Sequence, residues 1–168
     1  MAAKTYLFGV AMLVSNGDQI TIMQPPQFLQ IGVGKFLGIP IPIYIMATLV
    51  IASHILLQHT VFGRRAIAVG ANEVSAKLSG VNPHRTIITV YIISSVTASI
   101  AGIVMASLTQ QAYAMNATGY EFEVITAIVI GGTSLMGGKG SVVGALIGAV
   151  MVGFINNGLN LLDMPSAY

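Results

Sequence analysis

The sequence predicts an all-α integral membrane protein whose chain crosses a bilayer several times. Of its 168 residues, 55% are hydrophobic and only 7% are charged, whereas a soluble domain carries about 25% charged residues. The apolar residues are gathered in long runs. Four of the seven Lys and Arg residues lie between two of these runs, at Arg64, Arg65, Lys77 and Arg85. We therefore expect a single transmembrane domain over residues 1–168, a helical bundle with one charged loop at its surface.

The apolar runs divide the chain into five predicted membrane segments. The first, 5–18, has only about ten apolar residues, and a spanning helix needs roughly 20, so we expect it to be part of a longer helix. The other segments are expected at 43–62, 86–108, 122–136 and 142–162. Residues 19–42 are rich in Pro, Gly and Gln and predict an irregular surface segment without a regular helix.

The segment 122–136 is short for a membrane span, because glycine pairs interrupt it and the region after it. Thr118 and Glu121 have the spacing of a capping box, which would start the helix. We expect a short or re-entrant helix here. Together with 142–162 it forms a predicted pair of Gly-broken helices.

Residues 63–85 contain the features of a short, capped amphipathic helix. Asn72 is a favoured N-cap residue, and Glu73 lies in the first turn, where the helix dipole favours an acid. Glu73 and Lys77 have the favourable i,i+4 order for an ion pair, and Gly80 suits the position just after the helix. Apolar side chains repeat at helical spacing on one face, at Val74, Leu78 and Val81. Such a helix between two membrane spans is either a docking surface for another protein or a segment that only lies at the membrane interface.

The orientation of the chain follows from its basic residues. Arg64 and Arg65 favour a cytoplasmic position for 63–85, because cytoplasmic loops are enriched in Lys and Arg. The segments 25–42 and 110–123 then face outward. The simpler interpretation of the two arginines is that they only anchor the end of the preceding span.

Residues 131–149 are rich in Gly but do not form a phosphate-binding loop. Thr133 occupies the position of the first Gly of such a loop, and Gly140 follows Lys139 where a Ser or Thr is required. Small residues spaced by four instead let membrane helices pack closely. The glycine pairs either break helices that line a transport site or form a tight hairpin between helices. The glycines expected in this packing or breaking role are Gly131, Gly132, Gly137, Gly138, Gly140, Gly144 and Gly148.

Polar residues inside the apolar runs are few. Asn156 and Asn160 are one helical turn apart, and they either line a solute path or form hydrogen bonds between helices. His54 and His59 lack a third ligand, and the chain has no Cys, so no metal site is expected. Because no arrangement of nucleophile, base or paired carboxylates is evident, we expect neither an enzyme nor a bound cofactor. The net charge of +2 is too small to indicate nucleic-acid binding.

The stretch GRRAIAVGANEVSAKLSGVNPHR resembles the cytoplasmic coupling loop of ribose-type ABC transporter permeases, the membrane subunits of bacterial monosaccharide importers. Downstream residues match the same family, at Gly119–Glu121, Gly131–Leu135, Gly137-Gly138, Gly140 and Asn157–Leu162. The resemblance covers nearly the whole chain but only about the C-terminal half of such a permease. We therefore expect a fragment or a truncated product.

This resemblance implies a path for a sugar such as ribose across the bacterial cytoplasmic membrane. It also implies a separate ATP-binding subunit docked under the helix after Asn72, a soluble sugar-binding protein outside, a second permease copy, and surrounding lipid. Two alternatives stay open. One is a permease for another small polar solute, such as a branched-chain amino acid, and the other is a membrane scaffold that transports nothing.

Overall fold

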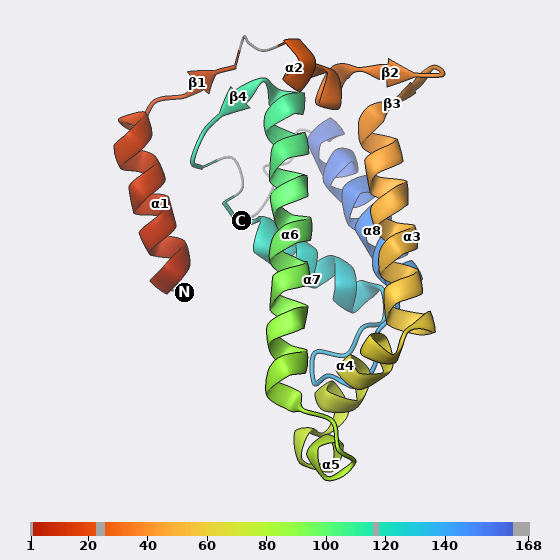
Figure 1. The fold of residues 1–168 in the computed structure, drawn as a ribbon. Coiled ribbons are helices and arrows are strands. Elements are labelled where there is room, and N and C mark those ends of the chain that lie inside the picture. The colour runs from red at the N-terminus through yellow and green to blue at the C-terminus, as the bar shows by residue number, and fades with distance from the viewer. Residues whose placement is uncertain (1, 23–25, 116–117, 163–168) are drawn as a thin grey trace. The chain divides into compact units, whose positions relative to one another are not determined.

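The computed structural model of the protein describes residues 2–22, 26–115 and 118–162, and most of them are helical (Figure 1). In chain order the elements are α1 (Ala2–Ser15), β1 (Ile20–Thr21), α2 (Pro26–Val33), β2 (Lys35–Phe36), β3 (Ile39–Pro40), α3 (Ile41–His59), α4 (Val61–Ala71), α5 (Glu73–Leu78), α6 (Pro83–Thr109), β4 (Gln111–Ala112), α7 (Tyr120–Ile130) and α8 (Val142–Leu161). Among the described helices, α3, α6 and α8 are long and apolar enough to cross a membrane. The predicted all-α membrane fold is therefore confirmed.

The helices follow the predicted apolar runs closely in the middle of the chain. The run 86–108 lies inside α6, and the run 142–162 coincides with α8. At 11 residues, α7 is about 16 Å long at 1.5 Å per residue, roughly half of a 30 Å hydrocarbon core. Which of these helices cross the bilayer, and how often, stays a prediction.

The chain forms two compact units, and the first contains Met1–Ala47 and Ser95–Thr118. In this unit β1 pairs with β4 in an antiparallel ladder. Helix α2 is held against the C-terminal end of α6 by Ser107, which is fully buried. The Ser107 hydroxyl donates to the Phe28 carbonyl oxygen at 2.6 Å and accepts from the Gly32 N–H at 2.8 Å. A Cβ atom at Gly32 would come within 2.5 Å of the Leu108 nitrogen, so only glycine allows this approach.

The prediction that residues 19–42 contain no regular helix is wrong. They include α2, eight residues long, and an antiparallel hairpin of β2 and β3. The physical reason is the position of the proline. Pro26 is the first residue of α2, where its missing N–H is not needed and its fixed φ suits the helix. The hairpin turns at Leu37 and Gly38, whose φ values of 51° and 83° both lie in the left-handed region that such two-residue turns require.

The second unit contains Thr48–Ser94 and Gly119–Tyr168. Here α3 ends at His59 and α4 begins at Val61, so the predicted span 43–62 ends earlier and Arg64 and Arg65 lie inside a helix. The bend is made by Thr60, whose hydroxyl accepts from the Gly63 N–H at 3.2 Å as an N-cap. Gly63 is buried against the Leu57 carbonyl oxygen, a contact that a Cβ atom would prevent.

The start and end of α7 also differ from the prediction. Gly119, with φ at 93°, is the N-cap of α7, and no side chain caps this end. The predicted capping box of Thr118 and Glu121 is therefore wrong, because Thr118 precedes the cap instead of occupying it. The helix ends at Ile130 rather than near 136, since Gly132 has a φ of 82° and leaves the helical conformation.

Candidate coupling helix and its glycine contacts

Helix α5 is fixed at both ends by its own caps. The Asn72 N–H donates to the Ala68 carbonyl oxygen at 3.1 Å, which closes α4, and the Asn72 side-chain oxygen accepts from the Ser75 N–H at 2.9 Å, which starts α5. After the helix, Gly80 has a φ of 80°, and its N–H donates to the Lys77 carbonyl oxygen at 3.1 Å. The predicted roles of Asn72 and Gly80 as cap residues are confirmed.

Helix α6 begins with its own cap directly after α5. The Asn82 side-chain oxygen accepts from the Arg85 N–H at 3.2 Å, and Pro83 is the first residue of α6. Pro83 is buried, and so is Thr86, whose hydroxyl donates to the Asn82 carbonyl oxygen at 3.0 Å. The segment between α5 and α6 is therefore a defined turn.

The outer face of α5 is apolar and open. Val74 is 69% exposed and Leu78 is 85% exposed, whereas Ala76 on the other face is 4% exposed. Glu73 and Lys77 are also exposed, as are Arg64 and Arg65 on α4. The third predicted member of the apolar face, Val81, is half-buried, because it follows the turn at Gly80 and its N–H donates back to the Ala76 carbonyl oxygen.

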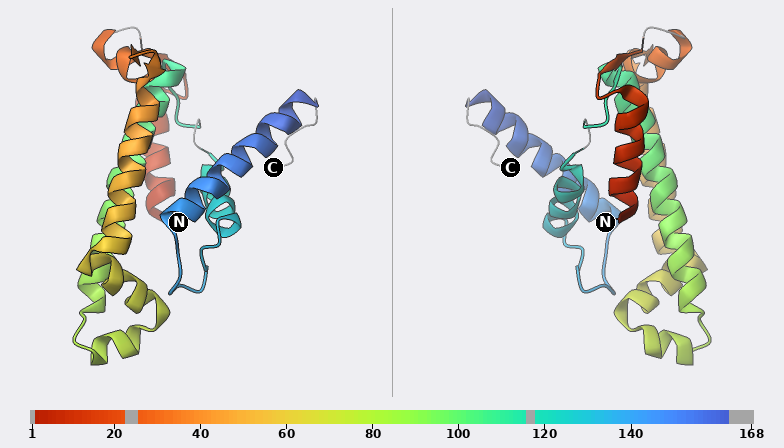
Figure 2. Two further views of the ribbon diagram at one scale, coloured as in Figure 1. Left: turned by 90° about the vertical axis from the view of Figure 1, so that its right-hand side faces the viewer. Right: turned by 90° about the vertical axis from the view of Figure 1, so that its left-hand side faces the viewer.

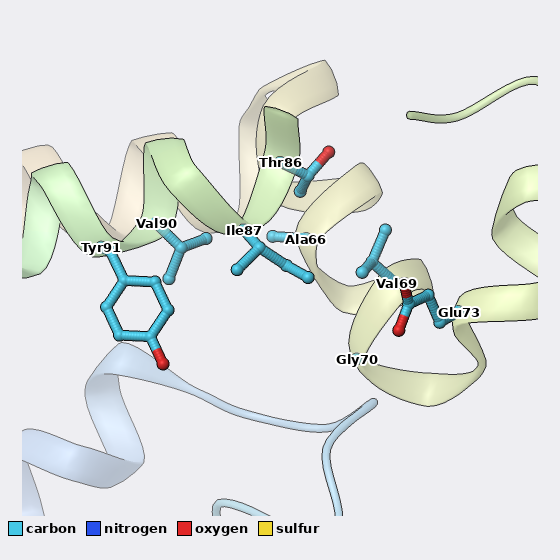
Figure 3. Close-up of a pocket in the computed structure, with 8 residues that line it drawn as sticks. All are labelled: Ala66, Val69, Gly70, Glu73, Thr86, Ile87, Val90 and Tyr91. Carbon is cyan, nitrogen blue, oxygen red and sulfur yellow. The ribbon is translucent and has the colours of Figure 1, made fainter. Parts of the chain in front are cut away.

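A shallow groove of about 320 Å³ lies between α4 and the start of α6 (Figure 3). Val90 and Tyr91 come from α6, and Glu73 lies beside Val69 at one end of the groove (Figure 3). The lining residues are Ala66, Val69, Gly70, Glu73, Thr86, Ile87, Val90 and Tyr91. Since Glu73 supplies the one charged group of this lining, the groove suits an apolar side chain better than a sugar.

The glycine loop between α7 and α8 touches the end of α4 by backbone contact. A Cβ atom at Gly137 would collide with the Gly70 carbonyl oxygen, and one at Gly138 would lie 2.8 Å from the Ala71 Cβ atom. In the views of Figure 2 this loop extends beyond the α7–α8 pair towards α4. The backbones of α4 and the loop therefore meet with almost no side chain between them.

Helices α7 and α8 cross at a second glycine contact. A Cβ atom at Gly144 would collide with the Gly131 carbonyl oxygen, and one at Gly148 would collide with the Ala127 carbonyl oxygen. Gly140 lies at the edge of this packing, where an added Cβ atom would be 3.3 Å from the Thr133 side chain. Among the residues that the structure describes, none has a heavy atom within 4 Å of a Cβ atom added at Gly132. The predicted glycines thus act in three ways, in helix packing, in the contact with α4, and in the turn after α7.

The role predicted for Asn156 and Asn160 in a solute path stays a prediction. Asn156 on α8 is half-buried, and the side chain of Asn160 lies outside the part of the chain that the structure describes. The rings of His54 and His59 have centroids 6.0 Å apart. No group of three metal-binding side chains occurs among the described residues.

Sequence reasoning missed the partner of the glycine loop. Gly70 and Ala71 end α4 and form the surface on which Gly137 and Gly138 rest. Their small size next to a cap residue is a signal that the sequence contained. Ser107, by contrast, is one hydroxyl in a long apolar run, and nothing near it in the sequence indicates its contact with α2.

These features define a multi-pass membrane protein with an exposed, capped helix in the connection between two candidate spans. A family model described as the permease component of the branched-chain amino acid transport system matches residues 2–168. The chain therefore belongs to this family of transport permeases.

Relatives of the chain are sugar permeases by name. The ribose import permease protein RbsC of Escherichia coli (strain K12) is 43% identical over 96% of this chain, and that of Bacillus subtilis (strain 168) is 38% identical over 100%. The L-arabinose transport system permease protein AraH of Escherichia coli (strain K12) is 35% identical over 98% of the chain. The matches cover 51%, 52% and 50% of these relatives, so the chain spans about half of their length. No solved structure matches the chain significantly.

Proposed function

We propose that this chain is part of the sugar-conducting permease subunit of an ATP-driven importer in the bacterial cytoplasmic membrane. The observation that carries the proposal is α5, where two caps present Val74 and Leu78 to solvent in the connection between two candidate spans. The names of the relatives, which are ribose and L-arabinose permeases, support a monosaccharide as the solute. Membership in a permease family supports transport rather than enzymatic catalysis.

The outer face of α5 is the proposed docking surface for an ATP-binding subunit. Active import needs ATP hydrolysis, and the Gly-rich stretch around Lys139 lacks the spacing of a phosphate-binding loop. ATP is then bound by a separate subunit, and the permease itself needs no cofactor. Val74 and Leu78 are the apolar anchors of this docking surface, since a few well-buried anchors contribute most of the binding energy of an interface. Lys77 and the other exposed charges around α5 form the rim.

Movement of α5 is passed on, in this proposal, through backbone contacts. Asn72 joins the last turn of α4 to the first turn of α5 by two hydrogen bonds. The last turn of α4 rests on Gly137 and Gly138, which connect α7 to α8. Packed backbones do not deform continuously, so a displacement at one end is carried to the other instead of being absorbed by side-chain rotation.

The solute path and the remaining partners follow the same proposal. Asn156 and Asn160 on α8 are its candidate lining residues. A soluble sugar-binding protein delivers the solute from outside, and a second permease copy completes the path. A branched-chain amino acid is the second candidate solute, because the family's description names that transport system.

The docking role is tested by Leu78→Asp in the intact permease expressed with the ATP-binding subunit of its importer. We expect the ATP-binding subunit to be lost on purification of the permease, since an unpaired carboxylate would be buried at the contact. Lys77→Ala is the matched control on the same helix. It should retain the subunit, because exposed charge pairs contribute only about 0.2–1 kcal/mol. Retention of the subunit by Leu78→Asp, together with normal uptake, would exclude the docking role.

The choice of solute is tested by uptake into cells that lack their other importers. Labelled ribose or arabinose should accumulate in an ATP-dependent manner, and labelled leucine should not. Accumulation of leucine alone would show that the solute is a branched-chain amino acid and not a sugar. Accumulation of neither solute in cells with a bound ATP-binding subunit would contradict both.

A further inference from the structure

The hairpin of β2 and β3 presents an apolar tip that is exposed in the described part of its unit. Phe36 is 62% exposed, Leu37 is 84% exposed and Ile39 is 43% exposed. Lys35, also exposed, is the single charged residue of the hairpin. Leu37 has a φ of 51°, a backbone conformation that residues other than Gly, Asn and Asp rarely adopt. A large apolar side chain in a strained turn and in water would be unfavourable twice, which indicates that something apolar surrounds it.

The hairpin is fixed to the first turn of α3. The Ile41 N–H donates to the Gly34 carbonyl oxygen at 2.9 Å, which closes the base of the hairpin. The Tyr44 hydroxyl donates to the Phe36 carbonyl oxygen at 3.1 Å. The rings of Phe36 and Tyr44 also pack edge to face, with centroids 6.0 Å apart. The tip therefore keeps a constant position relative to the beginning of α3.

That position is at the end of a candidate membrane span. Helix α3 begins at Ile41, directly after β3, and its apolar stretch is the length of a bilayer crossing. The two residues of β3 extend only about 7 Å at 3.3–3.4 Å per residue. A segment this close to the end of a span lies in the layer of lipid headgroups, where aromatic side chains and lysine are the preferred residues.

We propose that this hairpin is an interfacial anchor, with Phe36, Leu37 and Ile39 inserted at the boundary between lipid headgroups and acyl chains. The aliphatic part of Lys35 lies along the same boundary, and its ammonium group reaches the lipid phosphates. The occupant is lipid rather than a soluble protein for two reasons. The apolar tip leads directly into α3, an apolar candidate span whose natural surroundings are lipid, and its one charge is complementary to phosphate.

The absence of Trp from the whole chain makes the test direct, because a single introduced Trp is the only fluorophore of its kind. Leu37→Trp reports on the hairpin tip. Leu78→Trp is the matched control, since Leu78 on α5 has nearly the same exposure, 85% against 84%. Phe36→Trp is a second probe of the tip that keeps an aromatic ring and does not involve the strained turn position.

The purified 168-residue chain is reconstituted without its partners in vesicles of phosphatidylglycerol and phosphatidylcholine brominated near the headgroup end of its acyl chains. We expect brominated lipid to quench Leu37→Trp and Phe36→Trp several-fold more strongly than Leu78→Trp. Acrylamide in the water phase should quench in the opposite order. Equal quenching by brominated lipid at the tip and at position 78 would overturn the proposal. So would a tip that only an added soluble binding protein shields from acrylamide, because the occupant would then be a protein.

Discussion

Gly148→Ala should destabilise the α7–α8 pair, whereas Gly153→Ala on the same helix should not. A Cβ atom at Gly148 would collide with the Ala127 carbonyl oxygen and would lie 2.9 Å from the Gly131 nitrogen. Both neighbours are backbone atoms, which cannot rotate away, so the two helices must separate. Overpacking of this kind costs typically 1–3 kcal/mol. At Gly153 no heavy atom of the described residues lies within 4 Å of an added Cβ atom.

The comparison of the two variants isolates the helix contact. Replacing Gly by Ala inside a helix favours the helix by about 1 kcal/mol, and this contribution is common to both positions. The difference between the variants in free energy of unfolding is then the overpacking cost, about 1–3 kcal/mol. It is measured by reversible unfolding in mixed micelles, followed by circular dichroism. Equal stability of the two variants would refute the close crossing of α7 and α8 at this glycine.

Two further predictions concern the contacts that hold the elements of each unit together. Gly138→Ala should reduce uptake and leave binding of the ATP-binding subunit intact. Gly132→Ala has the same backbone strain, at a φ of 82°, but open space around it, so this variant should transport nearly normally. Co-purification and uptake are measured together, and equal transport by both variants would exclude the contact with α4 from coupling. Ser107→Ala should free α2 and accelerate hydrogen exchange at the Gly32 amide roughly tenfold or more, since an unsatisfied buried group costs about 1–3 kcal/mol. Ser99→Ala removes only a hydrogen bond within α6 and should leave this exchange unchanged. An unchanged exchange rate in Ser107→Ala would contradict the docking of α2.

The sequence predicted the elements whose signals are local. Asn72 and Gly80 fix the ends of α5 through bonds to residues within four positions, so the residue types alone indicate the helix and its limits. The spacing of Gly144 and Gly148 likewise indicated a close approach of helices. The long apolar runs predicted α6 and α8, because length and hydrophobicity are sufficient to recognise such helices.

The contacts between distant residues were not predictable in the same way. Ser107 and Gly32 are 75 positions apart, and neither has an unusual local sequence. The capping box at Thr118 failed because Gly119 adopts a left-handed conformation and takes the cap position itself. A glycine leaves several backbone conformations open, and only the packing around it selects one.

The glycines of the second unit show why spacing alone does not reveal what a small residue does. Gly148 and Gly153 lie on one helix, but only Gly148 has a backbone close enough to exclude a methyl group. Gly132 and Gly138 share the left-handed conformation, but only Gly138 meets another helix. Between helices in lipid, apolar side chains gain little from association, so attraction depends on close van der Waals contact. The two sites where backbones meet therefore join α4 to the loop before α8 and α7 to α8, and a force applied at α5 can reach α8 through them.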